Sequence, residues 1–411
     1  MNRIIYLDNN GTTALIKKAK EIYNMDLDGN MSSFGKYGQI TKNIYDRCLS
    51  IMFDYFNIKP PNRSNYNILF TSGASESNSS IILSRVLSFK GTGKPVIITS
   101  SYEHKSIKNC CDQLEEYNLC KIYKINPNSN GIIEPSKLTD LLKSLSTTEL
   151  NNIVLVTIMH VNNEIGSKND IYKLATICKE HKIPFHTDCT QSVKFMQYFE
   201  LNDINSLSLS FHKLGGPKGC GILLFDNTIK YYPIISGSQQ NGNRGGTENL
   251  YLIYSSIIAL NEIIKYRTVK NTALEMLRYK MIKILNDNFK CYYYSEVTNE
   301  TDMEKPYIII FGSDNKMYRV PNTIYFSIVT DPIINNNKLI QNLNNKNIIV
   351  SKGSTCNSAF SDNKTLTSIN APTCMINCVL RVSLGDENLT YMYKTIKSMQ
   401  TICDTIKELM K

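Results

Sequence analysis

The chain has 411 residues, 42% of them hydrophobic and 20% charged, which is typical of a soluble globular protein with two domains. No long apolar run occurs and the N-terminus is strand-like, so we expect no membrane span, no signal peptide and a cytoplasmic protein. The net charge of +10 comes from scattered lysines, and no nucleic-acid motif is present. It predicts a solvated basic surface and no nucleic-acid partner.

Strands and helices alternate over the first half of the chain. We predict strands at 6–8, 68–71, 95–100, 122–125, 153–159, 185–188 and 207–211, and helices at 17–25, 40–56 and 171–179. The near-continuous apolar run at 153–159 is typical of a strand buried on both faces of a parallel sheet. The alternation predicts an α/β domain with a mainly parallel sheet.

The second half predicts a different arrangement. A long amphipathic helix is predicted from about 250 to 288, including 253–266 and 274–285, and it leads to a second domain. Its strands are predicted at 307–311, 323–328, 348–351 and 380–384, and a closing helix at 391–410.

Twelve cysteines occur at irregular spacings, without the Cys-x-x-Cys pairs of a zinc site. We expect reduced, mostly buried thiols and no metal. Cys356 differs, because the small and polar residues around it predict an exposed loop, on which a thiolate could act as a nucleophile. A tolerated loop cysteine explains the same pattern equally well.

Polar side chains follow several predicted strands directly. They are Ser75, His104, Asn163, Asp188, Gln191, His212 and Lys213. Because ligands of parallel α/β sheets bind beyond the carboxyl ends of the strands, these residues predict one site. The other histidines, His160, His181 and His186, fit structural or surface roles better.

Lys213 ends a strand that we expect to be buried, where an ammonium group is costly unless it is paired or chemically converted. A Schiff base with pyridoxal phosphate (PLP) is one such conversion. By itself the segment fits a surface lysine in a turn better. The remaining requirements of PLP are also met, however, since Asp188 suits the pyridine nitrogen and His104 suits the flat face of the ring.

The sequence also offers candidate residues for binding the phosphate of PLP and the carboxylate of a substrate. A phosphate cup could be formed by Ala74, Ser75, Ser210 and His212. Asn163 and Gln191 could hold the ring oxygen or a substrate carboxylate, and the guanidinium of Arg381 matches a carboxylate in bidentate geometry. Each residue alone could equally be a cap, a turn residue or half of an ion pair, but their joint occurrence favours the PLP site.

These segments together resemble the NifS/IscS-type cysteine desulfurases, in the class V aminotransferase group of PLP fold type I enzymes. The matching motifs are Tyr-Leu-Asp-Asn-Asn-x-Thr-Thr at 6–13, Phe-Thr-Ser-Gly-Ala-Ser-Glu-Ser-Asn at 70–78, Glu-His-Lys at 103–105, Met-His-Val-Asn-Asn-Glu-Ile-Gly at 159–166, Asp-Cys-Thr-Gln-Ser at 188–192, His-Lys-x-x-Gly-Pro-Lys-Gly at 212–219, Arg-Gly-Gly-Thr at 244–247 and Arg-Val-Ser-Leu-Gly at 381–385.

The resemblance implies a fold and a reaction. The large PLP-binding domain would be 13–258, with a mainly parallel seven-stranded sheet, and a smaller α/β domain would combine 1–12 with 259–411. The reaction would convert L-cysteine to L-alanine and leave a persulfide on Cys356. The persulfide sulfur would then pass to an acceptor, which could be a partner protein.

The resemblance also implies roles for single residues. Lys213 would carry PLP, Asp188 would contact the pyridine nitrogen, and His104 would stack on the ring and carry protons. Gln191 would contact the ring hydroxyl, and Asn163 and Arg381 would bind the substrate carboxylate. The phosphate would be held by Ala74, Ser75, Ser210 and His212, and also by Thr247 of a neighbouring subunit, which implies a homodimer.

Other hypotheses are open at this point. The chain could be another class V PLP enzyme, such as a selenocysteine lyase or an aminotransferase, a catalytically impaired NifS-like protein, or a non-catalytic protein that keeps the fold to bind partners. One departure from the family pattern is Phe211, which stands where glycine is usual and is expected to crowd the phosphate end of the site.

Overall fold

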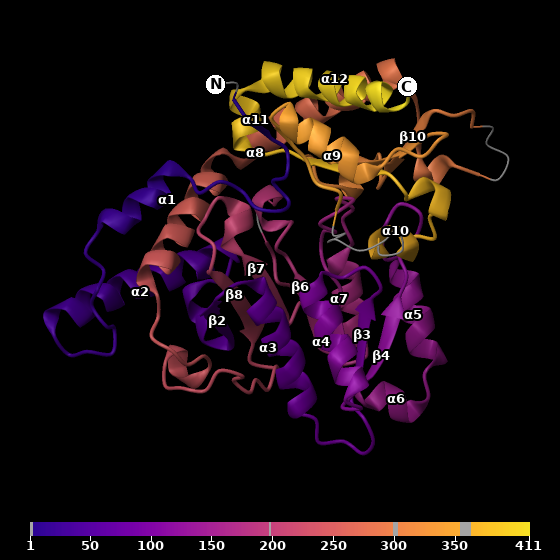
Figure 1. Cartoon of the computed structure of the whole chain (residues 1–411). Coiled ribbons are helices and arrows are strands. Elements are labelled where there is room, and N and C mark those ends of the chain that lie inside the picture. Colours follow the sequence, from indigo (N-terminus) through magenta and orange to yellow (C-terminus); the bar gives the residue numbers. More distant parts are fainter. Residues whose placement is uncertain (1–2, 197–198, 299–302, 354–362) are drawn as a thin grey trace.

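The computed structural model describes residues 3–196, 199–298, 303–353 and 363–411. Within these ranges, the larger sheet has the strand order β2-β8-β7-β6-β5-β3-β4 (Figure 1). The strands are β2 (Tyr66–Thr71), β8 (Gly221–Asp226), β7 (Ser206–Ser210), β6 (Phe185–Asp188), β5 (Ile153–Thr157), β3 (Val96–Ser100) and β4 (Lys121–Ile125). Only β8 pairs antiparallel with its neighbours among these strands, so the predicted mainly parallel, seven-stranded sheet is confirmed.

The sheet is buried on both faces. Along β3, Val96 and Ile98 belong to one hydrophobic core and Ile97 to another, because successive side chains of a strand point to opposite faces. One core is completed by α3 (Ala74–Leu87) and α4 (Lys105–Glu116). The opposite core takes side chains from α2 (Lys36–Tyr55), α5 (Pro135–Ser144) and α7 (Ile171–Glu180).

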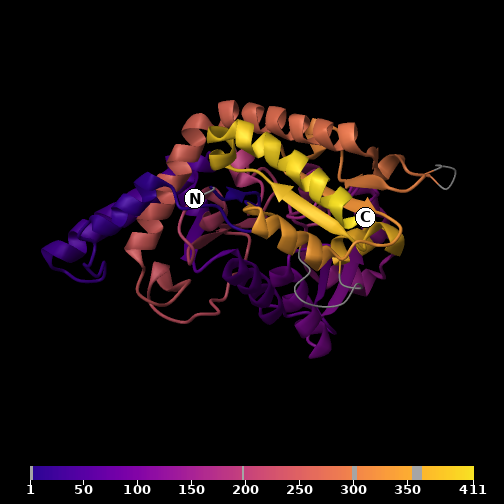
Figure 2. The same ribbon diagram turned by 45° about the horizontal axis from the view of Figure 1, so that its top comes forward.

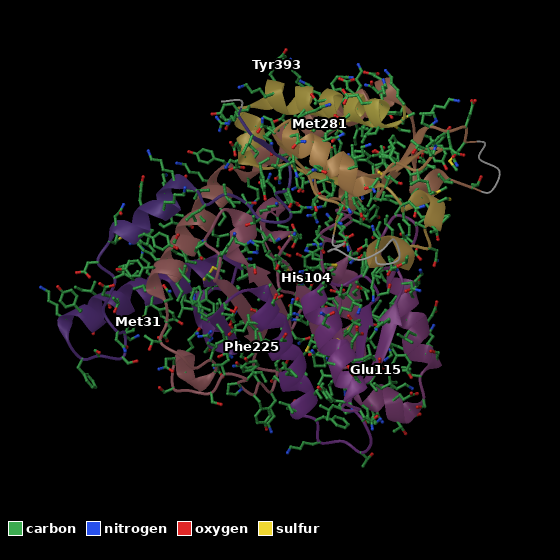
Figure 3. All side chains as sticks on the ribbon, viewed as in Figure 1. Met31, His104, Glu115, Phe225, Met281 and Tyr393 are labelled. Carbon is green, nitrogen blue, oxygen red and sulfur yellow. The ribbon has the colours of Figure 1, made fainter. Side chains whose placement is uncertain are left out.

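A smaller sheet lies above the larger one in Figure 1. Its order is β13 (Val379–Ser383), β11 (Thr323–Val329), β10 (Tyr307–Phe311) and β9 (Lys290–Tyr293). A separate core around Met281 joins this sheet to α9 (Asn336–Asn345), α12 (Met392–Leu409) and the second half of α8 (Leu250–Asn288) (Figures 2 and 3).

The long amphipathic helix predicted from about 250 to 288 is confirmed. The structure has one helix, α8, over Leu250–Asn288. The helix continues through its polar middle, because no Gly or Pro interrupts it there. This polar stretch separates the part of the helix that is buried against the larger sheet from the part that is buried against the smaller sheet. Leu260 packs into the core of the larger sheet and Leu277 into the core of the smaller one.

The first residues of the chain pack with the second half. β1 (Ile5–Tyr6) pairs in parallel with β12 (Ile348–Ile349), which is shorter than the strand predicted at 348–351. The division into domains at 258/259 stays a prediction, and this point falls inside α8. The remaining helices are α1 (Lys17–Glu21), α6 (Thr147–Asn151), α10 (Lys364–Ser368) and α11 (Asp386–Thr390). No helix in the described ranges has both the length and the apolarity to cross a membrane.

Candidate active site

A cavity of about 420 Å³ lies beyond the carboxyl ends of the parallel strands. It is lined by most of the residues that the sequence predicts for the site: Ala74, Ser75, His104, Asn163, Asp188, Gln191, Ser210, His212, Lys213 and Arg381. Figure 3 shows His104 near the centre of the molecule, between the two sheets. Two predicted residues are not among them. Thr247 is exposed on a loop elsewhere, and Cys356 lies outside the described residues.

Lys213 sits in a single helical turn, Phe211–Leu214, that follows β7. Its Nζ donates hydrogen bonds to the carbonyl oxygens of Asn10 (2.5 Å) and Gly11. Burial, together with the positive charge of Arg381, lowers the pKa of Lys213 to about 8. A large fraction of this amine is therefore neutral near pH 8 and able to attack a carbonyl carbon.

Phe211 does not crowd the cavity. Its side chain is fully buried in the core of the larger sheet, and it is not one of the residues that line the cavity. The backbone turns after β7, so the aromatic ring packs inward while His212 and Lys213 line the cavity.

Asp188, at the end of β6, is held by an amide network. Asn78 Nδ2 donates to Asp188 Oδ2 (2.9 Å), and the backbone N–H of Thr190 donates to Oδ1 (2.9 Å). The Asn78 Oδ1 is in turn 3.1 Å from His186 Nε2. Burial lowers the pKa of His186 to about 4, so the ring is neutral and serves to orient Asn78. The network fixes a buried carboxylate in the cavity wall.

His104 is the N-cap of α4. Its Nδ1 accepts a hydrogen bond from the backbone N–H of Ser106 (3.2 Å), which leaves Nε2 as the nitrogen that carries the proton of the neutral ring. Partial desolvation by the surrounding protein lowers the pKa of His104, although the residue keeps solvent-exposed surface, and the charge of Lys213 acts in the same direction. The ring is therefore neutral at pH 7.

Glu103 also lines the cavity, as a buried carboxyl group. Its Oε1 accepts hydrogen bonds from Ser100 Oγ and from the backbone N–H of Met159 (2.9 Å). Burial raises the pKa of Glu103 to about 8, and the charge of Asp188 acts in the same direction. The group is mostly neutral at pH 7, so it adds little negative charge beside Asp188.

The N-terminus of α3 forms another wall of the cavity. Ala74 is its first residue, and the Ala74 N–H donates to Ser210 Oγ (2.7 Å). Gly73, before it, has φ +154°, and a Cβ at this position would lie 3.2 Å from Ser210 Oγ. A side chain here would therefore fill the cradle in front of the helix, where backbone N–H groups favour an anion.

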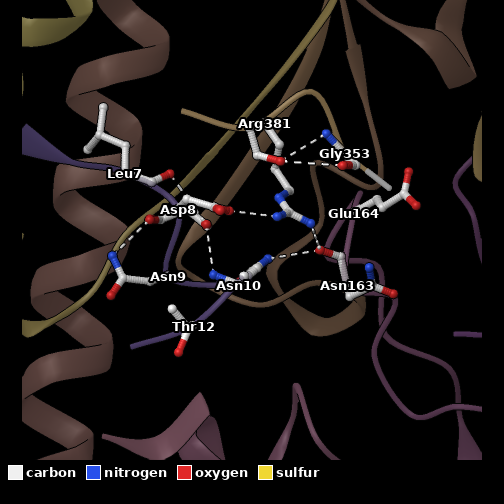
Figure 4. Close-up of polar contacts among 12 residues, drawn as sticks. Leu7, Asp8, Asn9, Asn10, Thr12, Asn163, Glu164, Gly353 and Arg381 are labelled. Atoms are coloured by element: carbon white, nitrogen blue, oxygen red, sulfur yellow. Dashed lines mark hydrogen bonds and ion pairs between the residues drawn. The ribbon is translucent and has the colours of Figure 1, made fainter. Parts of the chain in front are cut away.

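Arg381, on β13, reaches the cavity from the smaller sheet (Figure 4). Its Nη2 forms an ion pair with Asp8 Oδ1 (2.6 Å), and its Nη1 donates to the backbone oxygen of Asn163 (3.0 Å). Arg381 is 5% exposed, and its Nε has no hydrogen-bond partner among the described residues. The guanidinium is thus held in place with one donor still unused.

The residues of the cavity fit PLP. Asp188 offers an anion for a protonated pyridine nitrogen, His104 a flat ring, Lys213 an amine, and the start of α3 a cradle for a phosphate. Gln191 supports the same fit, because its Oε1 is buried without a partner in the described structure while its Nε2 donates to the Asn10 oxygen (3.1 Å). Such an orphaned polar atom is expected where a bound group supplies the missing partner.

Sequence reasoning missed four residues that shape the site. Asn78 orients Asp188, Asp8 orients Arg381, the Asn10 oxygen accepts from both Lys213 and Gln191, and Glu103 lines the cavity. All four lie in the motifs at 6–13, 70–78 and 103–105, and these motifs were the sequence feature that could have identified them as site residues. Spacing alone could not assign their contacts.

Comparison with known proteins places these observations in a family. The family model for aminotransferase class V matches residues 5–390. The cysteine desulfurase IscS of Dictyoglomus turgidum is 31% identical, over 98% of this chain and 97% of that protein. Among solved structures, a NifS-like protein from Rickettsia africae is 25% identical with a TM-score of 0.81, over 99% of this chain and 100% of that one.

A third similar protein carries a ligand. SspA, solved in complex with cysteine, is 26% identical with a TM-score of 0.71, over 92% of this chain and 98% of that one. The matches extend over both sheets and the cavity between them. The chain therefore belongs to the aminotransferase class V family, among relatives that are cysteine desulfurases of the IscS type.

Proposed function

We propose that the protein is a PLP-dependent cysteine desulfurase that converts L-cysteine to L-alanine. The observation that carries this proposal is the meeting of Lys213, Asp188 and Arg381 in one cavity, in a chain whose relatives are cysteine desulfurases. When bound, PLP supplies an electron sink for the bonds around the amino acid's α-carbon.

The residues of the chain would bind and orient the cofactor and the substrate. Lys213 would hold PLP covalently, Asp188 would keep the pyridine nitrogen protonated, and His104 would lie against the ring. The phosphate would be bound by Ala74, Ser75, Ser210 and His212, and the ring oxygen by Gln191. Arg381 and Asn163 would take the substrate carboxylate, for which the unused Nε of Arg381 is a ready donor. The Nε2 of His104 is the atom best suited to move a proton.

We further propose that Cys356 accepts the sulfur. Its thiolate would bond to the substrate sulfur while the carbon–sulfur bond breaks. The electron pair of that bond would stay on the substrate carbon, which takes a proton and becomes the methyl group of alanine. The product on the protein would be a persulfide, available to a sulfur acceptor.

We also propose a homodimer in the cytoplasm. Thr247 is exposed and is not one of the residues that line the cavity of its own chain, which suits a residue that completes a neighbouring subunit's phosphate site. An acceptor protein for the sulfur is part of the same proposal.

Absorbance spectroscopy tests the cofactor assignment. The purified protein should be yellow, and L-cysteine should change its spectrum. Lys213→Ala should lose the band of the covalently held cofactor, because Lys105, which also lines this cavity, begins α4 and does not occupy the turn after β7. An unchanged band in Lys213→Ala would refute the assignment.

Cysteine variants test the sulfur acceptor. Cys356→Ser should keep the yellow colour and lose sulfide release from L-cysteine in the presence of a reductant. Cys374→Ser is the matched control, since Cys374 is exposed and is expected to have no role. If Cys356→Ser is as active as the wild type, and an amino group passes to a keto acid, the protein is an aminotransferase instead.

A further inference from the structure

A second cavity, of about 240 Å³, shares Lys213 with the active-site cavity. Most of its wall is apolar, with side chains from Leu15, Ile16, Phe195, Leu214, Ile263 and Leu384. The cavity lies between the turn after β7, α8 and the start of α11. Nothing in the proposed reaction uses it.

Arg267, on α8, is the unusual residue of this cavity. It is 3% exposed, and none of its three guanidinium nitrogens has a hydrogen-bond partner among the described residues. Its guanidinium carbon lies 5.6 Å from the centre of the Tyr55 ring, and the Tyr55 side chain acts on the guanidinium but supplies no negative charge. A buried charge without a paired anion is costly, so a position of this kind indicates a missing partner.

Other buried arginines of the chain are satisfied by protein groups. On the same helix, Arg278 is 4% exposed, and its Nε donates to the backbone oxygen of Thr323 (2.9 Å). Arg319 forms a two-pronged ion pair with Glu275, at 2.7 and 2.6 Å. Arg267 is therefore an exception to the way this protein treats buried guanidinium groups.

The carboxylates that line the second cavity are already paired. Asp386 Oδ2 lies 2.5 Å from Lys270 Nζ, and Glu387 Oε1 lies 2.6 Å from Arg3 Nη2. Lys194, which also lines the cavity, adds another nitrogen. Burial, together with the charge of Lys213, lowers the pKa of Lys194 to about 7, so it is partly protonated at neutral pH. The cavity thus combines apolar walls with unneutralised basic groups.

We propose that this cavity is a binding site for a small carboxylate with a short apolar chain, whose carboxylate pairs with Arg267. The planar guanidinium fork matches a carboxylate in two parallel hydrogen bonds. The apolar walls favour a hydrocarbon chain over an inorganic anion, and the volume suits a molecule of a few carbon atoms. The site goes beyond the proposed desulfurase function and does not depend on it.

Thermal unfolding of the purified, cofactor-containing protein with butyrate tests this site. Butyrate should raise the melting temperature saturably, because a ligand that binds only the folded state stabilises it. Butan-1-ol, which lacks the charge, should not. Arg267→Met should weaken butyrate binding about tenfold or more. Without butyrate, this variant should be at least as stable as the wild type, since an unpaired buried charge is removed.

Two further variants separate this site from others. Arg47→Met removes an exposed arginine of α2 and should leave the butyrate effect unchanged. Arg381→Gln, in the active-site cavity, should also keep it. Arg267→Gln replaces Arg267→Met if the latter does not fold. The proposal is overturned if the Arg267 variants respond like the wild type, if butan-1-ol stabilises as well as butyrate, or if only Arg381→Gln loses the effect.

Discussion

At the scale of single residues, the pKa of Lys213 links the geometry of the site to a measurable property. Its lowered pKa, about 8, means that the neutral amine dominates above that pH. We predict that the rate of covalent PLP attachment to cofactor-free protein rises about tenfold per pH unit up to pH 8 and then levels off. Absorbance during reconstitution measures this rate.

The variant Arg381→Gln tests the direction in which Arg381 shifts the pKa of Lys213. Removing this positive charge relieves the repulsion that lowers the pKa of Lys213, while Asp8, which raises it, stays in place. The pH at which attachment levels off should therefore move upward. A downward or absent shift would show that Arg381 does not act on Lys213.

Asn78 is the second residue with a defined test. Its side chain bridges Asp188, Ser106 and His186, and all of these contacts are lost in Asn78→Ala. We expect the free energy of unfolding to fall by about 1–3 kcal/mol, because buried polar atoms lose their partners. Denaturant unfolding measures this change.

A matched control for Asn78 is Asn67. Its side chain donates to Asn227 (3.2 Å) at an exposed position, so Asn67→Ala should change the stability by less than about 0.5 kcal/mol. Equal losses in both variants would mean that the Asp188 network contributes nothing special to the fold.

The residues of the site differ in how far the sequence predicts them. Lys213, Asp188 and His104 could be predicted, because each lies at or shortly after the carboxyl end of a recognisable strand and these strand ends converge at one edge of a parallel sheet. Asn78 could not, since it lies inside α3 and its partners are up to 130 residues away. Arg267 gave no signal either, because its helical spacing does not show whether a protein group satisfies it.

At the scale of elements, α8 is the helix that packs into both main cores. We predict that Leu277→Ala lowers the free energy of unfolding by about 2–5 kcal/mol, since this fully buried side chain would leave a cavity in the core of the smaller sheet. Val269→Ala, at a position 74% exposed on the same helix, should have an effect near zero. Calorimetry or denaturant unfolding can compare the two variants.

One element that the sequence did not predict is the helix α9. α9 is rich in asparagine, a weak helix former, so its local signal is poor. It forms because Asn335 caps it, accepting from the Lys338 N–H (3.1 Å), and because Leu339 and Leu343 are buried in the core. Tertiary packing decides such segments, and the sequence pattern alone does not contain that packing.

At the scale of the whole molecule, the two sheets meet at the active-site cavity. The larger sheet supplies the groups expected to hold PLP, and β13 of the smaller sheet supplies Arg381, expected to hold the substrate. The overall architecture could be predicted because alternating strands and helices with polar strand ends have few alternatives. The pairing of β1 with β12 could not, because it joins segments more than 300 residues apart.

The formation of alanine from L-cysteine is the most direct test of the proposed desulfurase function. Purified wild-type protein, supplied with PLP and a reductant, should release alanine and sulfide in equal amounts. Lys213→Ala under the same conditions should release neither above background. Alanine formed equally by Lys213→Ala and wild type, or no alanine from a yellow wild-type protein, would contradict the proposed desulfurase function.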